Sequence, residues 1–341
     1  MSSKTATGKK AGFFSRIDPN VSRLLVVFFI IFLFGSIAKT GSFLSMGNFQ
    51  TIGKQLSEYG LMALGVGICM ISGGIDLSTV YIANLCGISA ALFMQKYATD
   101  ASAGTQMMVM TGAVLLALAI GAVCGAFNGL LVARFNIPAM LVTLGTYQLY
   151  MGIAIVISKG STVSGIPKSF TIFGTGMLFG IIPYSFLVFL LTVVALSFLM
   201  RHTTLGTRIY LVGTNAKSAK FAGINNNIVL IKTYMISGLV SALAGLLSLS
   251  RLNSAKADFG SSYTMQCILI VVLGGVNPNG GSGNISGIAI GVVILQTLSS
   301  LLNMFPNISN YYRDFIWGAA LIIILIANNL INARHTRKLS S

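Results

Sequence analysis

Few side chains in this 341-residue sequence are of types that carry out chemistry: six acidic residues, four cysteines and two histidines. Hydrolysis would call for a serine–histidine pair, an H-E-x-x-H motif or two facing aspartates, and the sequence contains none of these patterns. The four cysteines lie in apolar segments without a C-x-x-C pair, which is typical of small core residues. They are Cys69, Cys86, Cys124 and Cys267. We therefore predict no catalytic residue, no metal site and no cofactor.

The composition shows what kind of structure must hold these residues. The chain is 55% hydrophobic and only 8% charged, whereas about a quarter of the residues in a soluble domain are charged. This composition predicts an all-α membrane protein with about ten transmembrane helices. The expected spans are near 21–38, 50–72, 76–95, 106–133, 138–158, 181–200, 228–249, 263–275, 285–303 and 314–333.

The distribution of basic residues predicts how these spans are oriented. The net charge of +16 comes from lysines and arginines scattered singly, which does not suggest nucleic-acid binding. With both termini in the cytoplasm, most basic residues fall on the cytoplasmic side, as the positive-inside rule requires. We expect a basic N-terminal segment (1–20) that is not removed as a signal peptide, a transmembrane domain (21–333) with a cytoplasmic loop (201–232), and a basic tail (334–341).

The sequence offers no energy source for transport. It lacks G-x-x-x-x-G-K-[ST], and its most glycine-rich stretch, 274–287, contains no lysine. Ion-driven carriers need buried carboxylates, and of the six acidic residues only Asp76 is a strong candidate for deep burial. An ion-coupled secondary carrier is therefore a less favoured alternative to a passive pathway that takes its energy from elsewhere.

Two stretches interrupt the helical pattern, SGGIDLS at 72–78 and the glycine-rich stretch at 274–287. Each is either a surface loop or a broken helix that lines a cavity. Within the first, Asp76 has three interpretations. The favoured one is that it caps a helix starting at Leu77, after a turn made by two glycines. The others are that it lines a solute pathway or binds an ion.

Other polar side chains inside predicted spans are also pathway candidates. For each of them, hydrogen bonding between helices is the more common role. They are Asn84, Asn128, Thr143, Gln148, Gln266 and Gln296.

The cytoplasmic loop contains the signals of a short helix. Asn215 is a favourable N-cap, Ala219 and Lys220 follow at helical spacing, and Gly223 is a suitable stop. This helix either completes the turn between two spans or carries a specific contact.

Four blocks of sequence, in order and at consistent spacing, resemble the permease subunits of bacterial ABC importers for ribose, galactose and related simple sugars. The blocks are LMALGVGICMISGGIDLS (61–78), FNGLLVARFNIPAMLVTLGT (127–146), 205–247, and VVLGGVNPNGGSGNISGIAIG (271–291). The resemblance as a whole covers about four-fifths of the chain, and the third block is highly specific.

The resemblance implies a second permease subunit, identical or related, a cytoplasmic ABC ATPase and an extracytoplasmic sugar-binding protein. It implies that the loop around Gly213, Asn215, Ala219, Lys220 and Gly223 is the coupling helix that docks on the ATPase. The implied substrate is a simple sugar, with nucleosides or a furanose-like signalling molecule as alternatives. In one place the sequence departs from the family, because Thr264 and Gln266 stand where an acidic pair is usual.

Overall fold

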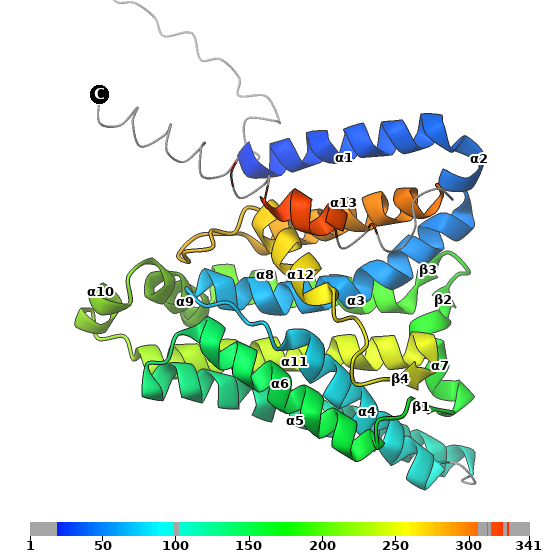
Figure 1. Ribbon diagram of the computed structural model, residues 1–341, viewed down its shortest axis with the longest axis horizontal. Helices are drawn as coiled ribbons and strands as arrows, with labels where there is room; N and C mark the ends of the chain where they lie inside the picture. The colour runs from blue at the N-terminus through cyan, green and yellow to red at the C-terminus, as the bar shows by residue number, and fades with distance from the viewer. Residues whose placement is uncertain (1–18, 99–101, 306–311, 313–314, 323–325, 327–341) are drawn as a thin grey trace, which may run out of the picture.

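The computed structural model describes residues 19–98, 102–305, 312, 315–322 and 326. Within these residues the chain is almost entirely helical (Figure 1). The helices are α1 (Pro19–Ala38), α2 (Thr40–Phe43), α3 (Met46–Ile71), α4 (Thr79–Ala98), α5 (Ala103–Phe135), α6 (Ala139–Ser158), α7 (Lys168–Thr175), α8 (Tyr184–His202), α9 (Thr204–Thr214), α10 (Ala216–Phe221), α11 (Asn226–Leu252), α12 (Tyr263–Leu273) and α13 (Ile285–Asn303).

The all-α class is confirmed, and the first nine predicted spans each fall on a helix. In the described part of the chain, six helices are long and apolar enough to cross a membrane. They are Val21–Ala38, Ala103–Phe135, Ala139–Ser158, Tyr184–His202, Asn226–Leu252 and Ile285–Asn303. The tenth predicted span, 314–333, lies largely outside the described residues, so the number ten stays a prediction.

The predicted span near 263–275 does not cross the whole membrane. Helix α12 has only 11 residues, which makes it about 17 Å long, whereas the hydrocarbon core of a bilayer is about 30 Å thick. The helix stops at Leu273 because the glycine-rich stretch begins there, and Gly275 has a φ of +84°. Helix α12 is therefore half of a broken helix.

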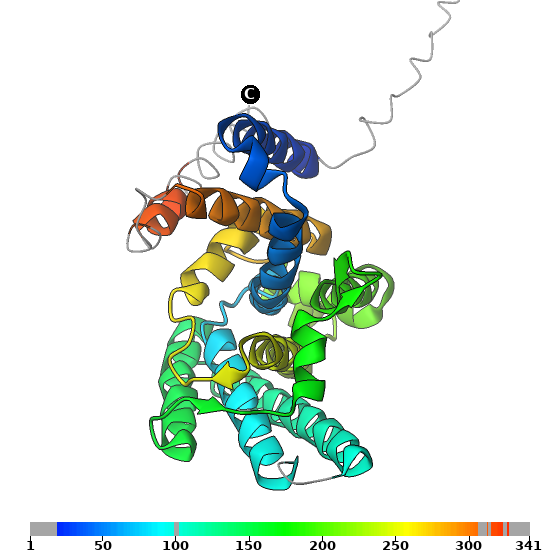
Figure 2. The ribbon, with the colours of Figure 1, turned by 90° about the vertical axis from the view of Figure 1, so that its right-hand side faces the viewer.

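Helix α11 lies at the centre of the bundle, packed against α3, α4, α5 and α7 (Figures 1 and 2). Its closest neighbour is α5, where glycines recur at every fourth position. A Cβ atom on Gly125 would lie 2.1 Å from the Tyr234 carbonyl oxygen, and one on Gly121 would lie 2.4 Å from that of Gly238. Small residues let membrane helices approach closely, and here they bring the backbones of α5 and α11 into contact.

The two ends of the bundle differ (Figure 1). One end carries α7 and four short strands, which are β1 (Val163–Ser164), β2 (Met177–Leu178), β3 (Ile182–Pro183) and β4 (Ser254–Ala255). These form two antiparallel pairs, β1 with β4 and β2 with β3. The other end carries α9 and α10, which lie in the predicted cytoplasmic loop.

Candidate functional site: two broken helices and the coupling helix

The first predicted break is present between α3 and α4. Helix α3 ends in a Schellman motif, in which the Gly74 N–H donates to the Cys69 carbonyl and the Gly73 N–H donates to that of Met70, both at 3.0 Å. Gly73 has a φ of +89°, a left-handed conformation that favours glycine. The chain then runs without helical structure to Ser78, and most of this segment is buried. This break therefore crosses the interior of the bundle.

The Asp76 carboxylate holds this segment in place. Its Oδ1 accepts from the Ser78 N–H (3.0 Å) and the Ser78 hydroxyl (2.7 Å), and its Oδ2 accepts from the Ser237 hydroxyl of α11 (2.9 Å). The capping interpretation is wrong, because α4 begins at Thr79 and not at Leu77. Asp76 instead closes a local turn onto Ser78 and ties the break to the central helix, while its side chain is fully buried.

A chain of hydrogen bonds extends this contact to two further helices. Asn128 of α5 donates to the Ser78 hydroxyl (2.8 Å), and Tyr150 of α6 donates to the Asn128 side-chain oxygen (2.9 Å). Thr143 of α6 donates to the Ile75 carbonyl (2.9 Å). We call Asp76, Ser78, Asn128, Tyr150 and Ser237 the polar network. It joins the break to α5, α6 and α11, so moving the break would require several buried hydrogen bonds to change.

The remaining pathway candidates are dispersed. Asn84 donates to the carbonyls of Ala257 (3.0 Å) and Phe259 (2.8 Å), which fixes the loop before α12. Gln296 donates to Gln55 (2.6 Å), Gln266 is buried on α12, and Gln148 is exposed on α6. The Gln296 contact joins two helices, α13 and α3, whereas the contacts of Asn84 join α4 to a loop. A role of these residues in the pathway stays a prediction.

A buried ion pair between α3 and α11 was missed by the sequence analysis. Glu58 of α3 is 1% exposed and binds Arg251 of α11 through two hydrogen bonds, Arg251 Nε to Oε1 and Arg251 Nη2 to Oε2 (2.9 Å). The expectation that only Asp76 is deeply buried is therefore wrong. The available signal was an acidic residue in an apolar helix, which needs a partner, but that partner lies 193 residues away.

Replacing Glu58 with glutamine is expected to destabilise the protein by about 3–5 kcal/mol, because Arg251 then keeps a largely buried charge without a counter-ion. The Glu58→Gln/Arg251→Gln double variant is expected to recover part of this loss, since no uncompensated charge remains. Thermal unfolding in detergent compares the two variants. Equal midpoints for both would show that the ion pair is not what matters at this position.

The predicted short helix is present as α10. The Asn215 side chain caps it by accepting from the Ser218 N–H (3.0 Å), and the helix stops before Gly223, whose φ is +79°. Ala219 is buried, whereas Lys220 is exposed and Phe221 is 93% exposed. Helix α9, which the sequence analysis did not assign, leads directly into α10. The short helix therefore offers one apolar side chain, Phe221, and two basic side chains, Lys217 and Lys220, at the end of the bundle.

The end of α9 is in direct contact with both broken helices. A Cβ atom on Gly213 would lie 2.0 Å from the Ile71 carbonyl oxygen and 2.7 Å from the Gly281 nitrogen. The Gly281 N–H donates to that same Ile71 carbonyl at 2.9 Å. Gly280 of the 276–284 loop packs against the end of α3 in the same way. A Cβ atom on Gly280 would lie 2.6 Å from the Cα atom of Gly73.

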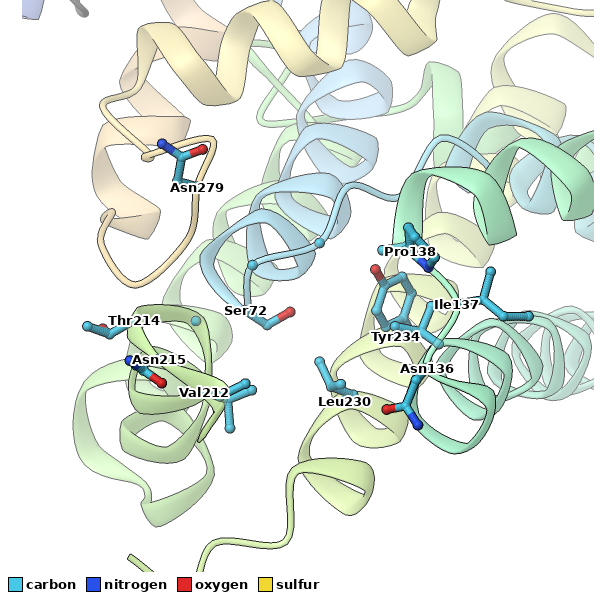
Figure 3. A pocket seen from close by; sticks show the side chains of 16 residues that line it. Ser72, Asn136, Ile137, Pro138, Val212, Thr214, Asn215, Leu230, Tyr234 and Asn279 are labelled. Carbon is cyan, nitrogen blue, oxygen red and sulfur yellow. The ribbon is translucent and has the colours of Figure 1, made fainter. Parts of the chain in front are cut away.

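We call Ile71, Gly73, Gly213, Gly280 and Gly281 the glycine junction. In it the end of α3, the end of α9 and the 276–284 loop meet backbone to backbone (Figure 3). A side-chain hydrogen bond also joins α9 to the 276–284 loop, because the Tyr210 hydroxyl of α9 donates to the Gly283 carbonyl (2.8 Å). The junction gives α10 a short mechanical connection to both breaks.

A bundle with six helices that are long and apolar enough to cross a membrane, two internal breaks and a structured loop at one end is the architecture of an integral membrane protein. Comparison with known proteins agrees, because residues 48–325 match the family model described as the permease component of the branched-chain amino acid transport system. The chain belongs to this family of ABC transport permeases, within the ribose/galactose-type group that its sequence motifs resemble.

Curated relatives support this assignment. The chain is 34% identical to the autoinducer 2 import system permease protein LsrD of Photorhabdus luminescens, over 81% of each chain. It is 30% identical to the autoinducer 2 import system permease protein LsrC of Yersinia pseudotuberculosis, over 89% of this chain and 82% of the relative. No solved structure is significantly similar.

Proposed function

We propose that this chain is a transmembrane subunit of an ATP-driven importer for a small furanose-like solute. The observation that carries the proposal is the similarity to LsrD and LsrC, whose names give autoinducer 2 as the imported molecule. Autoinducer 2 is a furanose-like signalling molecule. This favours the alternative named in the sequence analysis over ribose or galactose, and both belong to the same chemical class of small neutral polyols.

In this proposal α10 is the coupling helix and the ATPase is a separate subunit. Phe221 is almost fully exposed, which is unfavourable in water and is accounted for if it enters an apolar cleft of the ATPase. Lys217 and Lys220 lie exposed on the same short helix and would meet acidic side chains at the rim of that cleft. The glycine junction would then pass the movement of α10 to both broken helices.

The orientation and the partners follow from the same assignment. The predicted loop 201–232, which contains α9 and α10, would face the cytoplasm, as the positive-inside rule also favours. A binding protein would deliver the solute at the end that carries β1 to β4. Since the chain is similar to both LsrD and LsrC, the second permease would be a related chain or another copy of this one.

Reconstitution into vesicles tests the proposal. Vesicles that contain this chain, its partner permease, the ATPase and the binding protein are expected to accumulate autoinducer 2 only when ATP is present. Vesicles without this chain are the control. If vesicles with this chain alone accumulate the solute in response to an ion gradient, the chain is a secondary carrier. If vesicles without this chain accumulate the solute as well as the complete system does, the chain has no role in transport.

A further inference from the structure

The hairpin formed by β2 and β3 is an exposed turn without a polar side chain. Its residues, 177–183, read MLFGIIP, whereas turns at a protein surface are rich in asparagine, aspartate, serine and glycine. Phe179 at the tip is 89% exposed, and Ile181 and Ile182 are exposed beside it. Contact with water is unfavourable for such a surface, so an apolar partner covers it.

The tip of this hairpin keeps a phenylalanine where the backbone does not favour one. Phe179 (φ +52°) and Gly180 (φ +71°) both have left-handed conformations, as in the two-residue type I′ turn, for which Asn-Gly is the preferred sequence. A bulky residue is strained at a positive φ. Because asparagine would relieve this strain and suit water better, phenylalanine at this position indicates contact with an apolar environment.

The depth of the hairpin in the membrane follows from α8, which begins directly after it. Helix α8 has 19 residues, with Arg201 and His202 at its end, and is about 29 Å long. The hydrocarbon core of a bilayer is about 30 Å thick. Tyr184 at the start of α8 therefore reaches the opposite edge of the hydrocarbon, the level at which membrane proteins concentrate tyrosine and tryptophan. The hairpin lies at this boundary between acyl chains and headgroups.

The hairpin also lies on an outer side of the bundle. In Figure 2 it is at the edge of the bundle next to α8, which β3 contacts. The outer face of α8 is an apolar stripe at helical spacing, formed by Leu191, Val194 and Phe198, each more than half exposed. Such a stripe on a spanning helix faces acyl chains. The hairpin extends this lipid-facing surface beyond the end of the span.

We propose that the β2–β3 hairpin is a lipid anchor, which inserts into the headgroup layer of the bilayer so that Phe179 reaches the acyl chains beside α8. The partner is a phospholipid bilayer and not a protein, because the hairpin carries no charged, hydroxyl or amide side chain that could specify a protein contact. Its place in the extracytoplasmic leaflet rests on the proposed function, whereas its contact with lipid does not. A binding protein that docks at this end of the bundle must do so away from the hairpin.

Tryptophan fluorescence in lipid vesicles tests the anchor. The chain contains one tryptophan, Trp317, which stays in every variant so that its signal, measured in the wild type, can be subtracted. The full-length Phe179→Trp permease is reconstituted in phosphatidylcholine with bromine near the headgroup end of the acyl chains, where bromine quenches only nearby indole rings. The added fluorescence is expected to fall about two-fold or more, because an aromatic ring at the interface lies beside those chains.

Three further variants calibrate this result. Phe221→Trp reports on water, since Phe221 of α10 is 93% exposed and no ATPase is present, and it is expected to be quenched little. Leu191→Trp reports on the bilayer interior and is expected to be quenched more by bromine near the methyl end of the chains, the reverse of Phe179→Trp. Ile181→Trp, in the same hairpin, is a second reporter with the same expected result as Phe179→Trp.

Quenching of Phe179→Trp and Ile181→Trp no stronger than that of Phe221→Trp would overturn the anchor. An emission maximum that then moves to shorter wavelength only when the binding protein is added would assign the hairpin to that protein. A maximum at shorter wavelength than that of Phe221→Trp without the binding protein would assign it to another copy of the chain. Because the permease is measured alone, failure of the anchor leaves ATP-driven import unaffected, and absence of ATP-driven uptake by the complete system leaves the lipid contact unaffected.

Discussion

Uptake is expected to fall at least ten-fold when Gly213 is replaced with alanine, while the assembled importer continues to hydrolyse ATP. The added methyl group would lie 2.0 Å from the Ile71 carbonyl oxygen and 2.7 Å from the Gly281 nitrogen. Because both neighbours are backbone atoms, the end of α9 must move away from both breaks. Overpacking of this kind typically costs about 1–3 kcal/mol, which leaves the chain folded but separates α10 from the segments it is proposed to move.

The measurement compares solute accumulated with ATP hydrolysed in the same vesicles. Gly152→Ala is the matched control, because a Cβ atom on Gly152 of α6 meets nothing within 4 Å, and it is expected to behave as the wild type. Gly223→Val acts at the other end of α10, where the φ of +79° strains a β-branched residue, and is also expected to uncouple. Wild-type uptake per ATP in both Gly213→Ala and Gly223→Val would refute the coupling role.

Loss of the folded protein is the expected result of replacing Asp76 with alanine. The substitution leaves three buried donors without an acceptor, namely the Ser78 N–H, the Ser78 hydroxyl and the Ser237 hydroxyl. Each unsatisfied buried group costs about 1–3 kcal/mol, so the sum is about 3 kcal/mol or more. Typical domains are stable by only about 5–15 kcal/mol. Detergent-solubilised yield and thermal midpoint report this loss.

An asparagine at position 76 tests whether the carboxylate charge is needed, because asparagine has nearly the same shape as aspartate but is uncharged. Its side-chain oxygen can accept from Ser78, and the Ser237 hydroxyl can rotate to accept from its amide group. Asp76→Asn is therefore expected to retain most of the stability and most of the uptake. If this variant folds but does not transport, the carboxylate charge takes part in transport. If it unfolds as alanine does, the charge itself is needed for the fold.

Local signals account for what the sequence analysis predicted correctly. Helix α10 was predictable because its cap, Asn215, and its stop, Gly223, lie within a few residues of the helix they delimit. The first break was predictable for the same reason, since paired glycines end a helix whatever surrounds them. The approximate positions of nine helices, though not their ends, followed from the apolar runs, which are visible in the sequence without knowledge of the neighbouring helices.

The errors concern partners that are distant in the sequence. Asp76 was assigned to the helix that follows it, but one of its partners, Ser237, lies 161 residues away. Nothing in a single sequence indicates that α11 passes beside the first break. The same is true of Glu58, whose partner Arg251 lies at the end of α11, and of the glycine junction, whose three segments come from separate parts of the chain.

The hydrogen bond between the two breaks also limits where residues can be inserted into or deleted from this protein during evolution. The Gly281 N–H reaches the Ile71 carbonyl only while the segment from Val276 to Gly281 keeps its number of residues. An inserted or deleted codon there would misalign both loops at once. The turn between β2 and β3 is held differently, by an exposed side chain that can adapt: Gln50 donates to the Gly180 carbonyl (3.0 Å), and Phe179 in the same turn is 89% exposed. Insertions and deletions that arise during evolution are therefore expected to survive in that turn and to be eliminated from both breaks.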